Sequence, residues 1–306
     1  MTVIVINWNA GKRLKLCVDS ILVSDPSAEV VVVDNDSTDE SLDALVEDAR
    51  LRIIQTGENL GYGRAANVGL ANTEDEVVGV MNPDLVVDRG ALDALVDYLK
   101  GHPEVGVVGP ALRDPEDRPL QTCGFRPRLS DAICRKLLLH LVFPFFRFRR
   151  VRPVEPSEVD WVTGACLVGR REAFSSVDGF DEAIFMYFED VDLCLRLKAA
   201  GWQTHYVPTA SAQHVGGHSS AQAFDRMLIA SDRSYRFFTE RHLGRFSARL
   251  LSLLTPIELA LRSVGWLAVG VLPSKREGAL ARLRAYRQLF SENLSFSPER
   301  FRGSVL

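Results

Sequence analysis

The chain has 306 residues, of which 46% are hydrophobic and 25% charged, a composition typical of globular rather than disordered proteins. Its five cysteines form no CxxC pair and no even set, which disfavours a zinc ribbon and a disulfide framework and indicates a reducing compartment. The formal net charge of -4 gives no reason to expect a nucleic-acid partner, and an N-terminus without a basic region predicts no signal peptide and a cytoplasmic protein.

The first hundred residues alternate between short apolar runs and helical periodicity. Apolar runs predict strands at residues 3–6, 30–33, 52–55, 77–81 and 105–108. Periodic apolar residues predict helices at residues 14–22, 64–70 and 92–99, and a further one around Leu42, Leu45 and Val46. This order predicts an α/β fold, a three-layer α/β/α sandwich with a mostly parallel sheet.

Polar residues follow each of the first four predicted strands. They are Asn7 and Asn9, then residues 34–37, then residues 59–64, and then Asn82 and Asp84. Ligands of parallel α/β sheets bind beyond the carboxyl ends of the strands, so these clusters predict one binding edge. The chain has no GxGxxG after the first strand and no GxxxxGK[ST], which disfavours a dinucleotide-binding fold and a P-loop nucleoside triphosphatase.

Three of these clusters have both a functional and a structural interpretation. Asp84 could hold a divalent cation that bridges two phosphates, or it could form an Asx turn after Asn82 and Pro83. Asp34 could accept an N–H from a nucleobase or cap a following helix. Arg64 follows two glycines and could bind a phosphate, although a plain glycine turn explains the same pattern.

The strongest signal is an aromatic run at residues 185–188 followed by Glu189, Asp190 and Asp192. Helix capping explains one carboxylate at this position, but it does not explain three in a partly desolvated segment. One of them is therefore a candidate general base for an attacking hydroxyl group. Farther along, His214 precedes two glycines and is either a structural histidine or a metal ligand together with Asp84.

In this order, the segments resemble glycosyltransferase family 2, which has the GT-A nucleotide-diphospho-sugar transferase fold. The segments are VINWN (residues 5–9), VVVDNDSTD (31–39), NLGYGRAAN (59–67), NPD (82–84), WVTGAC (161–166), FEDVD (188–192) and His214. The resemblance covers about residues 2–220 and implies a catalytic domain at 1–220, with a basic amphipathic insertion at 126–152. It leaves residues 221–306 as a helical C-terminal region.

The resemblance also implies a role for each motif residue. Nucleotide-sugar binding falls to Asn7, Asn9, Asp34, Asp36, Arg64, Asn67, Asn82 and Asp84. Metal binding falls to Asp84 and His214, with Asn82 in place of the first acid of the family's DxD motif, and the expected cofactor is Mg²⁺ or Mn²⁺. Asp190 would be the catalytic base beside Glu189, and Trp161, Gly164 and Ala165 would border the acceptor. The implied reaction is a single displacement that inverts the anomeric carbon.

Within the family, the NWN, NPD and FEDVD forms are most similar to rhamnosyltransferases of cell-wall biosynthesis. This similarity implies dTDP-L-rhamnose as the donor and a polyprenyl-diphosphate-linked N-acetylglucosamine as the acceptor. Another nucleotide sugar used for a polysaccharide, or a non-catalytic sugar-binding protein, are the alternatives. A nucleotidyltransferase is disfavoured because no glycine-rich loop follows the first strand.

Two basic, apolar segments favour contact with phosphates or an anionic lipid surface. Residues 126–152 contain eight Lys or Arg against one acid, and residues 245–287 contain eight against two. Residues 250–272 are long enough to span a bilayer, but Glu258 and Arg262 interrupt them, which favours a position in the interface. Solvated helical faces, burial against the core, or a homodimer contact are the alternatives, and a peripheral protein at the inner face of the plasma membrane is expected.

Overall fold

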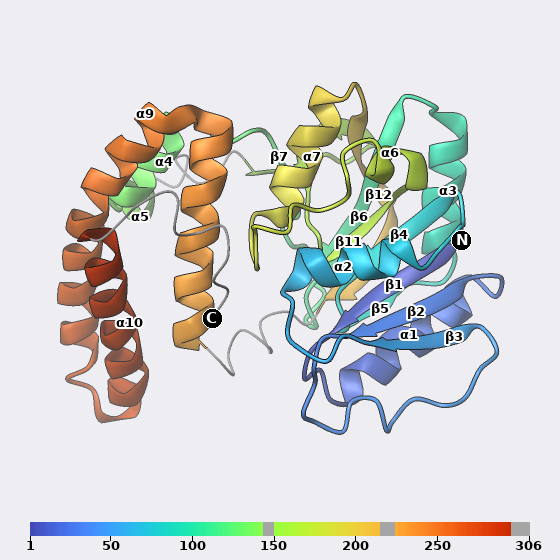
Figure 1. Ribbon diagram of the computed structural model, residues 1–306, viewed down its shortest axis with the longest axis horizontal. Coiled ribbons are helices and arrows are strands. Elements are labelled where there is room, and N and C mark those ends of the chain that lie inside the picture. The colour runs from blue at the N-terminus through green and yellow to red at the C-terminus, as the bar shows by residue number, and fades with distance from the viewer. Residues whose placement is uncertain (143–149, 215–223, 295–306) are drawn as a thin grey trace. The chain divides into compact units, whose positions relative to one another are not determined.

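The computed structural model describes residues 1–142, 150–214 and 224–294 (Figure 1). The chain divides into two compact units. The sheet unit comprises residues 1–126, 150–185 and 189–219, and the helical unit comprises residues 127–149, 186–188 and 220–306. The segment 127–149, which we expected within the first domain, thus groups with the C-terminal helices.

The sheet unit contains strands from both halves of the chain. Its strands are β1 (Thr2–Asn7), β2 (Glu29–Asp34), β3 (Leu51–Gln55), β4 (Val77–Met81), β5 (Leu85–Val87), β6 (Val105–Arg113), β7 (Cys123–Gly124), β8 (Arg150–Val151), β9 (Ser157–Val159), β10 (Trp161–Val162), β11 (Cys166–Arg170) and β12 (Gln203–His214). Its helices are α1 (Lys12–Ser24), α2 (Tyr62–Ala71), α3 (Ala91–Gly101), α6 (Arg171–Ser175) and α7 (Glu189–Ala199).

The main sheet has the order β3-β2-β1-β4-β11-β6-β12-β5, with β9 paired to β12. Strands β3, β2, β1 and β4 are parallel, as the alternation of strands and helices predicted. In the second half, β11 is antiparallel to both β4 and β6, and β5 is antiparallel to β12. A second, small sheet has the order β10-β7-β8. The predicted α/β class is confirmed, with a mixed sheet whose first half is parallel.

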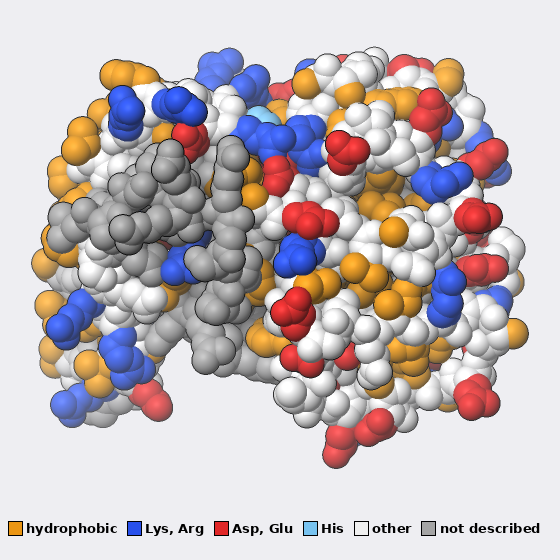
Figure 2. All heavy atoms as spheres, viewed as in Figure 1, with side chains coloured by type: hydrophobic (Ala, Val, Ile, Leu, Met, Phe, Trp, Pro, Cys, Tyr) orange, Lys and Arg blue, Asp and Glu red, His pale blue; other side chains and the backbone are white. Residues whose placement is uncertain are grey.

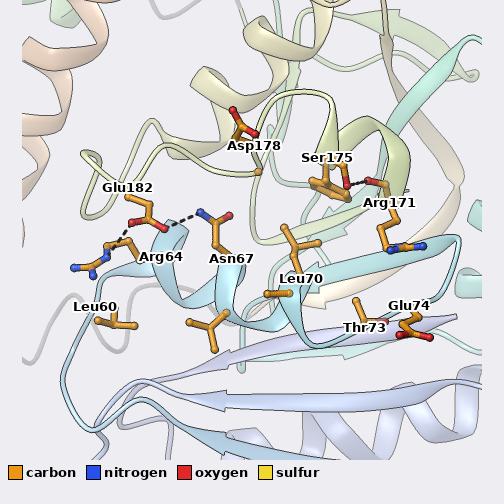
Figure 3. Close-up of a pocket in the computed structure, with 14 residues that line it drawn as sticks. Leu60, Arg64, Asn67, Leu70, Thr73, Glu74, Arg171, Ser175, Asp178 and Glu182 are labelled. Atoms are coloured by element: carbon orange, nitrogen blue, oxygen red, sulfur yellow. Dashed lines mark hydrogen bonds and ion pairs between the residues drawn. The ribbon is translucent and has the colours of Figure 1, made fainter.

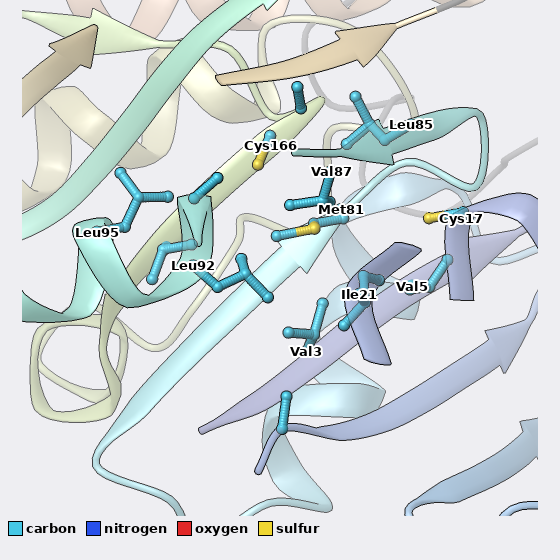
Figure 4. Close-up of a cluster of buried hydrophobic side chains, with 14 of the residues drawn as sticks. Val3, Val5, Cys17, Ile21, Met81, Leu85, Val87, Leu92, Leu95 and Cys166 are labelled. Atoms are coloured by element: carbon cyan, nitrogen blue, oxygen red, sulfur yellow. The ribbon is translucent and has the colours of Figure 1, made fainter. Parts of the chain in front are cut away.

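The core explains why continuous apolar runs form these strands. Every residue of β1 is buried, because helices cover both faces of the sheet. Val3 and Val5 pack with Cys17 and Ile21 of α1 (Figure 4). On the other face, Ile4 lies so close to Gly69 of α2 that a Cβ there would clash with it. Helix α2 therefore needs a glycine at this crossing to approach the sheet.

The predicted helix around Leu42, Leu45 and Val46 is wrong, because turns and irregular backbone connect β2 to β3. Leu42 and Leu45 pack against the core, whereas Val46 is 66% exposed. The buried Ser41 hydroxyl accepts a hydrogen bond from Asn7, which fixes the start of the segment. Packing of Leu42 and Leu45 against the core therefore holds this segment in an irregular conformation instead of a helix.

The helical unit consists of α4 (Leu129–Lys136), α5 (Leu139–Val142), α9 (Phe224–Val269), the 3-10 turn η2 (Pro273–Lys275) and α10 (Arg276–Leu294). Gly244, with a φ of 86°, breaks α9 into two helical parts. Helix α4 packs on α9 through Ala132, Tyr235 and Leu251. Helix α10 packs on α9 through Tyr286 and Leu289.

Some basic residues of the helical unit form ion pairs within that unit. The Lys136 side chain is 2% exposed, and its Nζ lies 2.8 Å from Glu258 Oε2. Arg262 Nε donates to the other oxygen of Glu258 at 2.9 Å. These two cations from the predicted basic segments are therefore internal partners of one buried acid, while residues 143–149 of the insertion lie outside the described residues.

Candidate active site

The first predicted binding residues, Asn7 and Asp34, meet at the ends of β1 and β2. Asn7 and Asp34 are register partners, and Asn7 Nδ2 donates to Asp34 Oδ1 at 2.7 Å. Both side chains are buried. Asn7 Oδ1 has no hydrogen-bond partner among the described residues. A buried acceptor without a donor is costly, so this oxygen suits a ligand N–H.

Asn9 and Asp36 lie in the loops that follow β1 and β2. Both adopt left-handed backbone, with φ angles of 50° and 65°. Asn9 Oδ1 accepts from Thr38 N at 2.8 Å, and Asn9 N donates to Ser37 Oγ at 3.0 Å. The Asp36 side chain is exposed. Positive φ at two non-glycine residues marks a loop whose shape the surrounding contacts enforce.

Asn35, which was not predicted as a site residue, follows Asp34 and is hydrogen-bonded to the loop at residues 59–61. Its Nδ2 donates to Asn59 Oδ1 at 3.0 Å, and its Oδ1 accepts from Leu60 N at 2.8 Å. Gly61 has a φ of 82°, and a Cβ there would clash with Phe185 O. The glycine is therefore needed where the loop passes residues 180–185.

Arg64 and Asn67 lie on α2 beside a groove of about 810 Å³ (Figure 3). Arg64 Nε lies 3.5 Å from Glu182 Oε2, and both side chains are well exposed, so this ion pair is weak. Asn67 is held more firmly, because its amide exchanges hydrogen bonds of 2.9 and 2.8 Å with the backbone of Phe180. Asn67 thus fixes the chain that leads to Glu182, and Arg64 keeps a guanidinium available to an anion.

Asp84 and His214 come together although they are far apart in sequence. Antiparallel pairing of β5 with β12 places His214 opposite Leu85. His214 Nε2 then lies 3.2 Å from Asp84 Oδ1, and the two side chains are 17% and 13% exposed. Two adjacent ligands of one hard cation are about 3 Å apart when each metal bond is about 2.1 Å. The pair therefore fits a shared divalent cation.

Asn82 lies next to this pair and supports it. Its Nδ2 is 3.4 Å from His214 Nε2, and its backbone N–H donates to Ala165 O at 2.9 Å. Within the described residues, no group of three or more His, Cys, Asp or Glu side chains could hold a metal ion. Asp84 and His214 would thus supply two ligands to a cation, and its other ligands would come from the substrate and water.

Asp190 stands in the first turn of α7, fixed by backbone donors. Gly164 N donates to its Oδ2 and Val191 N to its Oδ1, both at 2.8 Å. The hydroxyl group of the buried Tyr62 donates to Gly164 O at 2.5 Å. A hydrogen-bonded carboxylate at a helix N-terminus is favoured in its charged form, which a proton acceptor needs.

Glu189, one residue earlier, has a different environment. It is buried, and its Oε2 has no hydrogen-bond partner among the described residues. Burial and the neighbouring carboxylates of Asp190 and Asp192 raise the pKa of Glu189 to about 8. Burial therefore favours the neutral form of Glu189, so Asp190, which is held by two backbone N–H groups, is the better candidate base.

Tyr62 lies near both the candidate base Asp190 and the predicted metal ligand Asp84. Burial raises its pKa well above the usual value, and the charges of Glu189, Asp190 and Asp84 raise it further. These acids are thus close enough to act on a single phenol group. Tyr62 could not be chosen from the sequence, because its role depends on Gly164, which lies 102 positions away.

The remaining predicted residues are engaged in structure. Trp161 Nε1 donates to Phe125 O at 3.1 Å, and the side chain is buried. Ala165 is buried, and its carbonyl oxygen accepts from Asn82 N, whereas the Gly164 backbone donates to the candidate base. Asp192 is fully buried and binds Arg196 Nε at 2.7 Å. Asp192 is thereby a structural partner within α7.

This arrangement can now be compared with known proteins. Residues 2–177, more than half of the chain, match the family model described as Glycosyl transferase family 2. The chain belongs to glycosyl transferase family 2. The predicted family is thus confirmed, and with it the assignment of this protein as a glycosyltransferase.

Two relatives of this glycosyltransferase match over most of their length. It is 36% identical over 286 residues to the N-acetylglucosaminyl-diphospho-decaprenol L-rhamnosyltransferase of Mycobacterium tuberculosis, covering 86% of this chain and 91% of the relative. It is 27% identical over 259 residues to the rhamnosyltransferase WbbL of Escherichia coli, covering 82% and 94%. The similarity therefore extends beyond the family model into the C-terminal helices.

A solved structure shows the same fold. The mannosyltransferase PcManGT from Pyrobaculum calidifontis, in complex with GDP-Man and Mn²⁺, superposes with a TM-score of 0.53 at 18% identity and covers 96% of this chain and 86% of its own. The GT-A fold predicted for this glycosyltransferase is confirmed. The roles of its individual residues remain predictions from geometry.

Proposed function

We propose that this glycosyltransferase moves L-rhamnose from dTDP-L-rhamnose to a polyprenyl-diphosphate-linked N-acetylglucosamine in cell-wall biosynthesis. Identity of 36% to the mycobacterial rhamnosyltransferase, across 91% of that protein, supports this substrate pair. The observation that carries the reaction type is Asp190, a carboxylate held by two backbone N–H groups at the start of α7.

The thymine base of the donor suits the Asn7 and Asp34 side chains at the ends of β1 and β2. Thymine presents one N–H between two carbonyl groups. The Asp34 carboxylate and the unsatisfied Asn7 Oδ1 are both acceptors, which fits that N–H. Uracil presents the same edge, so this pair of side chains supports a pyrimidine nucleotide in general, and the choice of dTDP rests on the resemblance of the sequence motifs to rhamnosyltransferases.

The diphosphate belongs near Asp84, His214 and Arg64. Asp84 and His214 would hold a divalent cation, Mg²⁺ or Mn²⁺, which supplies charge stabilisation to the departing diphosphate. Arg64 reaches the same edge of the sheet from the first turn of α2 and offers a fixed positive charge. Its weak pairing with Glu182 is readily exchanged for a phosphate oxygen.

The chemical step is a single displacement. The acceptor hydroxyl oxygen attacks the anomeric carbon while Asp190 accepts its proton, and the bond from that carbon to the diphosphate oxygen breaks. Attack from the face opposite the leaving group inverts the anomeric configuration. Hydrogen bonds from Gly164 and Val191 orient Asp190 and stabilise its charged form before it takes the proton.

The acceptor places the enzyme at a membrane. A polyprenyl diphosphate is anchored in lipid, while a nucleotide sugar is a soluble cytoplasmic metabolite. We place the reaction at the cytoplasmic face, where both substrates are available. In this placement the protein is peripheral, and the sheet unit holds the donor.

A donor panel tests the proposal. Purified protein is incubated with a synthetic GlcNAc-diphospho-polyprenol and dTDP-L-rhamnose, UDP-glucose, UDP-galactose or GDP-mannose, with Mg²⁺, Mn²⁺ or EDTA. We expect transfer from dTDP-L-rhamnose that EDTA abolishes. Transfer from another donor would keep the mechanism and reject rhamnose, and no transfer from any donor would support a non-catalytic sugar-binding protein.

A further inference from the structure

The part of α9 after Gly244 has one exposed apolar face. The exposed fractions are 77% for Phe246, 74% for Leu253, 48% for Ile257, 47% for Leu261, 67% for Val264 and 60% for Leu267. From Leu253 these residues are spaced by four, four, three and three positions, which keeps them on one side of a helix. Figure 2 shows hydrophobic side chains exposed on the surface of the helical unit. We call this set the α9 apolar face.

The opposite side of the same helix is packed against protein. Leu251 and Leu259 belong to buried clusters formed with α4 and α10. Glu258 also lies on this side and is buried with Lys136. By length and composition, Met227–Val269 could cross a membrane, but a helix packed on a charged partner on one side is not surrounded by lipid. One-sided exposure instead suits a helix that lies in the plane of a membrane interface.

Exposed cations flank the α9 apolar face at both ends. Arg245 is 85% exposed, and Arg249 is exposed one turn later. Lys275 and Arg276 are exposed just after the last apolar residues. Between residues 246 and 276 the only acid is Glu258, which is buried. An apolar surface that is bordered by cations and has no exposed acid between residues 246 and 276 is complementary to anionic lipid.

A second copy of the chain fits this face less well. If two copies met through it in parallel, each cationic end would face the same end of the partner. If they met antiparallel, Arg245 and Arg249 would face Lys275 and Arg276. Both arrangements bring like charges together at each end of the contact, which disfavours association.

We propose that the α9 apolar face inserts into the headgroup region of an anionic membrane and anchors the enzyme beside its lipid-linked acceptor. The role beside the acceptor rests on the proposed function, whereas membrane binding itself does not. Inserting the face buries six apolar side chains that the structure leaves exposed to water, and the flanking arginines and lysine bind lipid phosphates.

Vesicle sedimentation tests the anchor on the full chain. The probes are vesicles of phosphatidylglycerol mixed with phosphatidylcholine, and vesicles of phosphatidylcholine alone. We expect binding to the anionic vesicles, and a loss of at least about tenfold in partition coefficient for the double variant Leu253→Glu/Val264→Glu. The matched control is Val23→Glu, a residue of α1 in the sheet unit that is 59% exposed, which should bind like the wild type.

Two further measurements separate the possible outcomes. With a water-soluble short-chain GlcNAc-diphospho-lipid, the double variant should keep wild-type turnover, whereas with vesicle-embedded acceptor it should lose about tenfold. Unchanged vesicle binding by the double variant would overturn the anchor, even if rhamnosyl transfer were intact. Sedimentation velocity identifies the rival, because a wild-type dimer that this variant dissociates, without loss of lipid binding, would make the face a self-association surface.

Discussion

The Tyr62 hydroxyl group donates a hydrogen bond to the carbonyl oxygen of Gly164, whose own N–H donates to the candidate base Asp190. Gly164 is thus hydrogen-bonded both to Tyr62 at the start of α2 and to Asp190 at the start of α7. Tyr62 N also donates to Phe185 O at 2.9 Å, so the same residue fixes the chain that leads into the FEDVD segment. Tyr62 acts as a positioning residue, since it orients the base through Gly164.

Replacing Tyr62 with Phe should therefore impair catalysis more than donor binding. We expect kcat to fall by about tenfold to a hundredfold, because a base displaced by a fraction of an ångström loses much of its advantage, while KM for the donor stays within about twofold. Tyr98→Phe is the control, since it removes a comparable hydroxyl that pairs with His205 Nδ1 elsewhere in the sheet unit. Equal losses in the two variants would indicate a general effect on folding.

The adjacent acids Glu189 and Asp190 should respond differently to amide substitution. Asp190→Asn removes the proton acceptor, so kcat should fall by about a thousandfold or more while nucleotide binding survives. Glu189→Gln replaces an acid that burial already favours in its neutral form, so kcat should stay within about tenfold. Initial rates give kcat for both variants, and calorimetry gives their nucleotide affinity. A larger loss of kcat in Glu189→Gln than in Asp190→Asn would identify Glu189 as the base instead.

Metal binding should depend on the contact between Asp84 and His214. Asp84→Asn and His214→Ala should each weaken Mn²⁺ binding in the presence of dTDP by about tenfold or more, because each removes one of two protein ligands. Isothermal titration calorimetry measures the affinity, and Asp97→Asn, an exposed acid of α3, serves as the control. Unchanged affinity in both site variants would reject the pair as a metal site.

The high pKa of Glu189 predicts how stability depends on pH. Its pKa is about 8 in the folded protein, against an ordinary value of 4.5, so the folded state binds this proton more tightly than the unfolded state. The contribution of Glu189 to the free energy of unfolding is therefore fully present below about pH 4.5. As the pH rises to 8, the free energy of unfolding falls by about 1.4 kcal/mol per pH unit.

Glu189→Gln should remove this loss, because glutamine stays neutral at every pH. Thermal unfolding in EDTA, without nucleotide, should show the melting temperature of the variant rising relative to wild type between pH 6 and pH 9. The two proteins should differ least near pH 5. A constant difference across this range would show that Glu189 is already charged in the folded protein.

The sequence predicted the parallel half of the sheet well because three of its four strands contain a continuous buried run. Val3, Val31 and Val80 each lie in such a run, whereas the edge strand β3 is largely exposed. The helix predicted at Leu42, Leu45 and Val46 was wrong, because an irregular loop can also bury two of three apolar residues that have helical spacing. Three residues are too few for periodicity to distinguish a helix from such a loop.

The contacts between distant segments could not be predicted from local pattern. Asn67 was expected near the diphosphate, yet its amide is bonded on both sides to the backbone of Phe180. Asn35 was passed over because its neighbours Asp34 and Asp36 carry the charges, although its amide joins two loops of the site. Residue type indicated polarity at these positions, and only the fold determines which partner each side chain meets.

The pairing of β5 with β12 also determines when the site can form during synthesis. Strands β1 to β4, with the Asn7 and Asp34 pocket, are complete once about the first hundred residues have emerged, whereas His214 reaches Asp84 only after β12 is made. A chain that ended before residue 203 would therefore keep the Asn7 and Asp34 pair and lack His214, one of the two proposed metal ligands.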